Sequence, residues 1–257
     1  AGGGAFSLPE RKEYALPETG SQPKRSGGFS GGATACGIRV SVEKRIFAVR
    51  PLTCGARRTM KESWKPGTMI YPLPAVLVGC GDAPDNWNLL TVAWTGTVCT
   101  APPMCYVSVR PERHSHALIA RTGEFTINLT TAAMARAVDW CGVRSGRDYD
   151  KFRETGLTPL RGAVVAAPAL EESPVVVECR VRQILPLGSH DMFLAEVVNV
   201  LVDDRYIDSA TGRFDLERAG LVAYSHGEYF RLGELIGHFG WSVRRRKIIV
   251  RERKGRR

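Results

Sequence analysis

The stretch RPERHSH at residues 110–116 brings two arginines, two histidines and a serine together just after an apolar run. Arg110 and Arg113 carry planar guanidinium groups, which bind phosphate and carboxylate through paired hydrogen bonds. If a helix begins near Ser115, its free backbone N–H groups and the positive end of its dipole also attract an anion. The residue types therefore predict an anion-binding turn. A serine N-cap beside two solvated arginines explains the same spacing equally well.

Strands and short helices are needed to position this turn. The pattern predicts extended segments on both sides of it and a helix over 113–123 that closes at Gly123. A second helix is predicted from about Asp148, and two long strands are predicted to pair across PLGSHD. The predicted strands are 75–81, 89–98, 104–110, 124–129, 174–185 and 192–204. Many strands with few short helices favour an antiparallel barrel over a doubly wound sheet.

The segment 88–98 has two different faces if it forms one strand, because successive side chains alternate. One face is small and hydroxylated, with Thr91, Ala93, Thr95 and Thr97. The other face is expected to be core and carries Leu90, Val92, Trp94 and Val98. In the following strand Ser108 and Arg110 share a face. A flat hydroxylated surface beside an anion-binding turn is typical of a site for a planar ligand that carries an anionic group.

The formal charge of +10 lies in the tails. Residues 1–59 carry 10 Lys/Arg against 4 Asp/Glu and residues 244–257 carry 9 against 1, which leaves 17 against 21 for residues 60–243. The middle is therefore mildly acidic. We expect a globular domain over 60–243 and a disordered basic tail over 244–257. The Gly- and Ser-rich segment 1–59 is expected to be a disordered extension, either a targeting segment or a non-native start.

Cysteine usage and hydropathy restrict the class of protein. Seven cysteines at irregular spacing, without a CxxC pair, argue against a disulfide framework or a structural zinc site, so we predict no metal. No apolar run approaches the roughly 20 residues of a membrane helix, and the first thirty residues lack the apolar region of a signal peptide. We therefore expect a cytoplasmic protein with no membrane association.

His190 lies at the tip of the predicted hairpin, in GSHD. An imidazole there could donate or relay a proton to a ligand bound at the sheet. The alternative is a turn histidine that bonds locally to Asp191, and the residues alone favour this alternative.

Several segments together resemble the flavin reductase-like, FMN-binding split-barrel family, and within it the flavoredoxin-type branch. They are YPLPAVLVGCG, NLLTVAWTGTVCTAPPMCYVSVRPERHSHALI, GEFTINL, CGVRSGRDYDKF and LGSHDMFLAEV. The resemblance runs from about Tyr71 to Val243. It implies a mainly β protein, a six-stranded antiparallel split β-barrel with short helices. It also implies a homodimer with FMN near the subunit interface.

The resemblance also implies roles for particular residues. Those against the flavin ring and ribityl chain would come from the strand that starts at Asn88, and are Thr91, Ala93, Trp94 and Thr95. The phosphate would be held by Ser108, Arg110, Arg113 and Ser115. Asn128 and the loop with Ser145 and Lys151 would complete the enclosure. His190 would be the catalytic residue.

Three functions remain open at this point. The first is an NAD(P)H-dependent flavin reductase that passes electrons to an acceptor such as a monooxygenase component. The second is an FMN electron carrier that a partner protein reduces, without direct nicotinamide turnover. The third is nucleic-acid binding through RRRKIIVRERKGRR, but a solubilising tail is the commoner role of such a segment, so we consider specific nucleic-acid binding unlikely.

Overall fold

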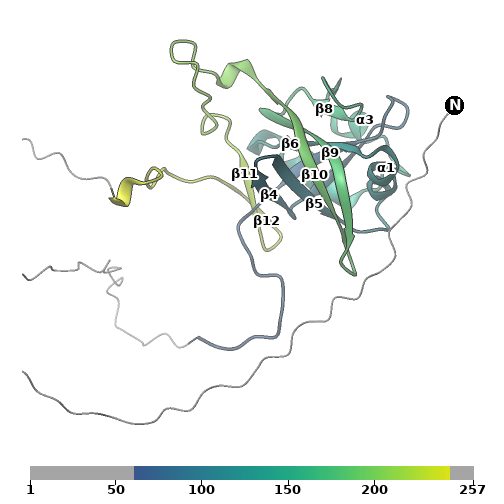
Figure 1. Ribbon diagram of the computed structural model, residues 1–257, viewed down its shortest axis with the longest axis horizontal. Coiled ribbons are helices and arrows are strands. Elements are labelled where there is room, and N and C mark those ends of the chain that lie inside the picture. The colour runs from purple at the N-terminus through teal and green to yellow at the C-terminus, as the bar shows by residue number, and fades with distance from the viewer. Residues whose placement is uncertain (1–60, 244–257) are drawn as a thin grey trace, which may run out of the picture. The chain divides into compact units, whose positions relative to one another are not determined.

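The computed structural model describes residues 61–243 (Figure 1). The predicted extension at 1–59 and the basic tail at 244–257 lie outside these residues. The described strands and helices belong to one compact unit that begins at Trp64. Within 61–243, no helix has the length and apolar character needed to cross a membrane.

The main sheet has seven strands in the order β3-β2-β6-β9-β10-β5-β4, and every neighbouring pair is antiparallel. Figure 1 shows β9 and β10 as a long hairpin beside β5 and β4. The strand bounds are β2 Val76–Cys80, β3 Asn88–Val92, β4 Thr95–Thr100, β5 Pro103–Val109, β6 Glu124–Leu129, β9 Val175–Pro186 and β10 Asp191–Val202. All six strands predicted from the sequence are present.

The sheet closes through a strand that is broken in two. β3 and β4 are separated only by Ala93 and Trp94, yet they stand at opposite ends of the strand order. The break is held by a hydrogen bond from the Ser108 N–H to the Trp94 carbonyl, at 2.9 Å. One strand thus serves both edges, which makes the sheet a split barrel. The prediction of a mainly β split barrel is confirmed. The strand count differs in detail, with seven strands where six were predicted, because the predicted strand 89–98 is divided into β3 and β4.

The break also shifts the alternation of side chains, so one sequence prediction is wrong. Trp94 and Val98 were expected on the core face, but Trp94 is 37% exposed and Val98 is 50% exposed. Thr95 was expected on the open face, but it is buried and its Oγ1 donates to the Tyr106 carbonyl at 2.6 Å. An unbroken period of two cannot persist through a kink, and hydrophobicity alone does not reveal where the kink falls.

Two apolar clusters stabilise the barrel, and β2 belongs to both. Val76 and Val78 point into the barrel interior, which also contains Phe125 and Phe193. Leu77 points outward, against the helices that cover the other face. Every residue of β2 is therefore buried, which explains why VLVGC has no polar side chain.

Within residues 61–243, the α-helices are α1 His114–Thr122, α2 Ala135–Val143 and α3 Lys151–Thr155, and they pack on the sheet. The short 3-10 turns are η1 Ala132–Met134, η2 Asp204–Tyr206 and η3 Trp241–Val243. Helix α1 ends at Gly123, whose φ of 68° suits a residue without a Cβ, as predicted. The second predicted helix begins at Lys151 rather than Asp148, because the Asp150 side chain accepts from the Phe152 and Arg153 N–H groups and caps it there.

Two small sheets lie outside the barrel. One contains β1 Leu73–Pro74, β11 Val222–Ser225 and β12 Glu228–Arg231, in the order β1-β11-β12. The other pairs β7 Pro159–Arg161 with β8 Pro168–Leu170. The sequence patterns did not predict these short strands.

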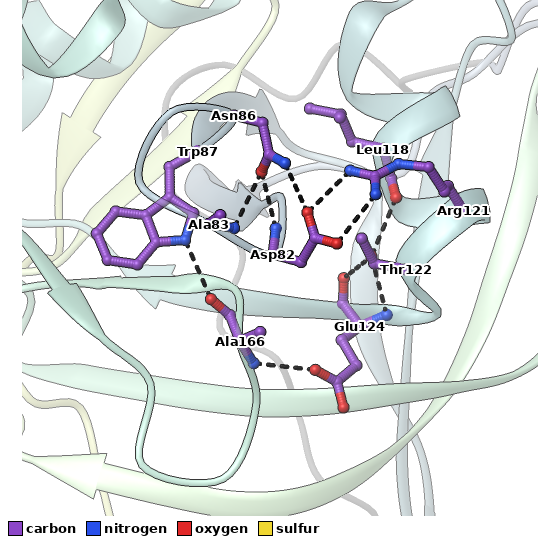
Figure 2. A network of polar contacts seen from close by, with 9 residues as sticks. All are labelled: Asp82, Ala83, Asn86, Trp87, Leu118, Arg121, Thr122, Glu124 and Ala166. Atoms are coloured by element: carbon purple, nitrogen blue, oxygen red, sulfur yellow. Dashed lines mark hydrogen bonds and ion pairs between the residues drawn. The ribbon is translucent and has the colours of Figure 1, made fainter. Parts of the chain in front are cut away.

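The turn between β2 and β3 is attached to the C-terminal end of α1 (Figure 2). Arg121 donates two hydrogen bonds to the Asp82 carboxylate, at 2.9 and 3.0 Å. Asn86 closes the turn by accepting from the Asp82 and Ala83 N–H groups. The Trp87 indole N–H donates to the Ala166 carbonyl at 3.1 Å. This network fixes the start of β3 against α1, the two elements that carry Asn88 and Ser115.

Candidate functional site

Two adjoining cavities share Leu90, Arg110 and Arg113. The first, here called the wide cavity, measures about 330 Å³ and the second, the cationic cavity, about 250 Å³. The wide cavity is lined by the broken strand, the end of β5, His190 and two tyrosines, with Thr91, Ala93, Trp94 and Ser108 among the predicted residues. The cationic cavity is lined by the start of α1 and the loop before α3, with Asn88, Ser115, Ser145 and Lys151 among them.

Positive charge dominates the cationic cavity. Its lining contains Arg110, Arg113, Arg144, Arg147 and Lys151, against a single carboxylate, Glu112. Glu112 lies 3.5 Å from Arg110, and both side chains are mostly exposed. Among residues 61–243, none of the other four cations forms an ion pair. Cations that the fold leaves unneutralised around a cavity are suited to binding an anion.

Lys151 is a buried cation at the floor of this cavity. Its side chain is only 3% exposed, and its Nζ donates to the Cys141 carbonyl at 2.7 Å. Burial lowers the pKa of Lys151, while it raises the pKa of Cys80 and of Cys141 to about 11, so both thiols stay neutral at physiological pH. The thiols therefore supply no counter-charge. A dianion in the cavity would supply one.

The first turn of α1 faces the same cavity. The N-cap residue is Arg113, whose side chain makes no capping hydrogen bond; its Nη1 donates instead to the Gly142 carbonyl at 3.2 Å. Ser115 is buried and its Oγ accepts from Asn88 Nδ2 at 2.8 Å. The alternative of a Ser115 N-cap is therefore wrong, because the helix begins earlier than the serine. The arrangement joins a helix N-terminus to two arginines, as the anion-binding hypothesis requires.

The broken strand forms the wall of the wide cavity. Thr91 donates its Oγ1 proton to the Val138 carbonyl of α2, and a Cβ on Gly142 would approach the Thr91 side chain to 3.3 Å. Ala93 and Trp94 follow at the kink, next to Ser108 on β5. The kink thus provides a short exposed edge, flanked by small side chains and one large aromatic ring.

His190 also lines the wide cavity, beside Trp94. Its ring centroid is 4.6 Å from that of Trp94, with 39° between the planes, and its Nδ1 is 3.0 Å from the Ser189 hydroxyl. Burial lowers the pKa of His190, and the positive charge of Arg110 lowers it further. Asp191 is bonded to His116, at 2.8 Å, and not to His190. The alternative interpretation, in which His190 bonds locally to Asp191, is therefore wrong.

Two predicted residues do not line either cavity. Asn128 is fully buried, and its amide donates to the Leu77 carbonyl and the Thr126 hydroxyl and accepts from the Leu170 N–H. Its hydrogen-bonding groups serve to join β6, β2 and β8. Thr95 points away for the reason given above. Of the predicted cofactor-binding residues, ten therefore line the cavities, whereas Asn128 and Thr95 serve the structure of the barrel. The predicted catalytic residue, His190, also lines the wide cavity.

Two arginines and two tyrosines are among the cavity-lining residues that sequence reasoning missed. Arg144 and Arg147 flank Ser145 in a quoted motif, and the signal that could have found them is their charge. Tyr224 and Tyr229 line the wide cavity from the β11–β12 hairpin, which no pattern predicted. Tyr229 donates to Asp139 at 3.3 Å; burial, with Asp139 nearby, raises its pKa to about 12.

The arrangement suits a ligand with a flat, partly apolar portion and a phosphate-like end. Ligand sites typically measure about 300–1,000 Å³ and place a few polar groups in an apolar lining. The wide cavity, at about 330 Å³, falls in this range, and the smaller cationic cavity, at about 250 Å³, adjoins it with most of the polar groups. Among the described residues, no group of three or more His, Cys, Asp or Glu side chains could hold a metal ion.

Comparison with known proteins gives a consistent picture. A family model described as a flavin reductase like domain matches residues 68–233. The flavoredoxin of Desulfovibrio vulgaris (Miyazaki F) is 31% identical with a TM-score of 0.66, covering 72% of this chain and 100% of that one. An FMN-binding protein from Thermus thermophilus is 26% identical with a TM-score of 0.59, covering 71% and 99%. The reductase component of a Rhodococcus opacus 4-nitrophenol 4-monooxygenase/4-nitrocatechol 2-monooxygenase is 30% identical over 111 residues, 42% of this chain and 55% of that protein.

Proposed function

Because the chain belongs to the family of flavin reductase-like domains, we propose that it binds FMN and is an NAD(P)H-dependent flavin reductase. The observation that carries this proposal is that the wide cavity and the cationic cavity meet at Arg110 and Arg113, which line both. A cation-lined end and a broken-strand wall match the two chemically different ends of FMN. Its phosphate is a dianion, and its ring system is planar and largely apolar.

The residues present fit this group. The FMN phosphate would be held by Arg110, Arg113 and Lys151, with the backbone N–H groups of the α1 N-terminus. The ring would lie along the kink at Ala93 and Trp94 and below His190. Thr91, Ser108 and Asn88 would face the chain that connects the two ends, and Ser145 would close the phosphate end.

Bound FMN would supply the redox chemistry, by accepting a hydride from NAD(P)H and passing electrons onward to an acceptor. The chain's own residues would position the ligand and manage charge. Arg110 lies between the phosphate end and the wide cavity, so its guanidinium would also stabilise negative charge on the ligand there. His190, with a lowered pKa, would be mostly neutral at physiological pH and able to exchange a proton at its ring nitrogens.

The first test is flavin binding. We expect the purified protein to show flavin absorption bands or to bind added FMN saturably, and Arg110→Ala to weaken that binding. Oxidation of NADH or NADPH by the FMN-loaded protein then tests the reductase step. Failure to bind FMN would remove the whole proposal, whereas FMN binding without turnover of either nicotinamide would remove only the reductase claim.

The second candidate is an FMN electron carrier that a partner protein reduces. The likeness to a flavoredoxin, which spans that whole chain at 31% identity, favours it. The cavities are the same in both functions, so the two differ only in the electron donor. Slow reduction of the bound flavin by NAD(P)H, together with fast reduction by a ferredoxin-type donor in a stopped-flow experiment, would favour the carrier.

The proposed partners are a second copy of the chain and a redox acceptor such as a monooxygenase component. Large apolar side chains stand exposed in the described C-terminal part, as expected of a surface that another chain covers: Phe230, Leu232, Leu235, Ile236 and Phe239. Light scattering of the FMN-loaded protein tests the homodimer. Because NAD(P)H is the proposed donor, we propose the cytoplasm as its place of action, which cell fractionation tests.

A further inference from the structure

One histidine–carboxylate contact near the site has no part in the function proposed above. His116 Nε2 lies 2.8 Å from Asp191 Oδ2, and each side chain is only 17% exposed. The two residues are 75 positions apart in sequence. The His116 ring also packs edge-on against Phe193, with 5.1 Å between ring centroids and 71° between planes. The pair is therefore held from two sides, unlike an exposed ion pair between free side chains.

The pair joins the elements that carry the two ends of the site. His116 lies in the first turn of α1, one residue after Ser115, which lines the cationic cavity. Asp191 is the first residue of β10, one residue after His190. Asp191 also pairs with Val109, the last residue of β5 before Arg110.

His190 itself is held less firmly. The Leu187 N–H donates to the His190 carbonyl at 2.9 Å and closes the hairpin turn. The His190 side chain contacts the neighbouring Ser189 and the Trp94 ring. Within the described chain, the side chains of Ser189 and His190 make no hydrogen bond to α1. Asp191 is the first residue after the hairpin tip whose side chain bonds to α1, through His116.

We propose that His116 and Asp191 form a positioning pair. The pair fixes where the His190 ring lies over Trp94 relative to the proposed phosphate-binding residues at the α1 N-terminus, here called the phosphate grip. Neither residue lines the wide cavity or the cationic cavity. The pair fixes the distance between the residues that would hold the phosphate and the residue that would exchange the proton. This inference rests on the proposed function for its effect on turnover, but not for its effect on the geometry of His190.

The first measurement is made on the protein without added flavin. The ¹H–¹³C correlation of the His190 ring reports its position, because the Trp94 ring current shifts a proton held at this distance. We expect Asp191→Ala and His116→Ala to move the His190 resonance toward the value of an exposed histidine. Asp191→Asn, which keeps an acceptor at the same place, should retain most of the shift. Asp82→Ala, which breaks the ion pair at the other end of α1, is the matched control and should leave the resonance unchanged.

The second measurement uses the FMN-loaded protein. Since misplacement of a catalytic group by about 1 Å can cost up to about 100-fold in rate, we expect Asp191→Ala to lower kcat by about tenfold. The dissociation constant of FMN should change by less than about threefold, because the phosphate grip stays in place. In a His190→Ala background, Asp191→Ala should have almost no further effect, since the two changes act through one side chain.

An unchanged His190 resonance in Asp191→Ala would overturn the proposal, and so would a loss of FMN affinity as large as the loss of kcat. Fully multiplicative losses in the double variant would also overturn it. A protein that binds no flavin or oxidises no NAD(P)H would fail the proposed function instead. In that case the His190 resonance still decides whether the pair positions this ring.

Discussion

The two ends of α1 differ in how their arginines are paired. At the C-terminal end, Arg121 donates two hydrogen bonds to Asp82, and Asn86 donates to the same carboxylate (Figure 2). At the N-terminal end, Arg113 donates to a backbone carbonyl, and the neighbouring cations of the cavity have only Glu112 opposite them. One end thus contains a neutralised pair, and the other contains a surplus of positive charge.

The difference separates a structural role from a binding role for the same residue type. A cation that the fold neutralises contributes to stability, and its loss leaves a carboxylate without its partner. A cation that the fold leaves open costs stability through repulsion and desolvation, and gains a partner only when a ligand binds. Stability and ligand affinity should therefore respond in opposite ways to substitutions at the two ends.

The largest expected effect is on FMN affinity at the N-terminal end. Arg113→Ala should weaken FMN binding by about 10- to 100-fold, because a charged hydrogen bond contributes roughly 1.5–3 kcal/mol. Arg121→Ala should leave the affinity within about twofold, since Arg121 lies at the far end of the helix. Titration of flavin fluorescence measures both. Equal losses in the two variants would show that Arg113 acts only through the fold.

Lys151 gives the sharpest contrast between stability and FMN affinity, because burial of its charge opposes folding. Its pKa in the folded protein is below the ordinary 10.5, so the unfavourable contribution is fully present at neutral pH and is lost as pH rises from that lowered pKa to 10.5. Lys151→Met should keep the free energy of unfolding or raise it by up to about 1 kcal/mol. The same change should weaken FMN binding by about tenfold, through loss of one charge on the phosphate.

Chemical denaturation and FMN titration of Lys151→Met test this pair of effects together. Arg121→Ala is the matched control, and it should lower Tm while it keeps FMN affinity. A Lys151→Met protein that is both less stable and unchanged in FMN affinity would reverse the comparison between the two ends.

The pH dependence of stability sharpens the comparison at the C-terminal end. Hydrogen bonds from Arg121 and Asn86 lower the pKa of Asp82 from 3.8 to about 2. The stabilisation from this carboxylate is therefore fully present above pH 3.8 and is lost as pH falls to about 2. Thermal unfolding of wild type and Asp82→Asn should differ modestly at pH 6, and the difference should vanish near the lower pH. A difference that persists there would assign the stabilisation to hydrogen-bond geometry rather than charge.

Most of the fold was predictable from the sequence because its signals are local. Alternating side chains indicated the long hairpin, and Gly123 indicated the end of α1. The kink after Val92 was not predictable, because neither Ala93 nor Trp94 is a residue type that favours turns. The closing of the barrel imposes the break instead. Trp94 and Thr95 were placed on the wrong faces for that reason alone.

The candidate site was predictable where its residues are neighbours in sequence, as in RPERHSH. It was not predictable where the fold decides the partner of a polar group. Asn128 is as polar as Asn88, yet strand groups satisfy its amide and it lines neither the wide cavity nor the cationic cavity. Asp191 bonds to a histidine 75 residues away rather than to its neighbour. Arg121 and Arg113 differ for the same reason, because Asp82 is 39 residues from Arg121.

The smallest expected effect is on the titration of His190, which reports the surplus charge directly. Burial and then Arg110 lower the pKa of His190 below its ordinary 6.5. Arg110→Ala should therefore raise that pKa, whereas Arg121→Ala should leave it unchanged, as an NMR titration of the His190 ring can measure. Binding of a phosphate dianion beside Arg110 should raise the pKa in the wild type as well, because it neutralises the same charge. If neither change moves the His190 titration, the field of the cationic cavity does not reach the wide cavity, and the two must act separately on a ligand.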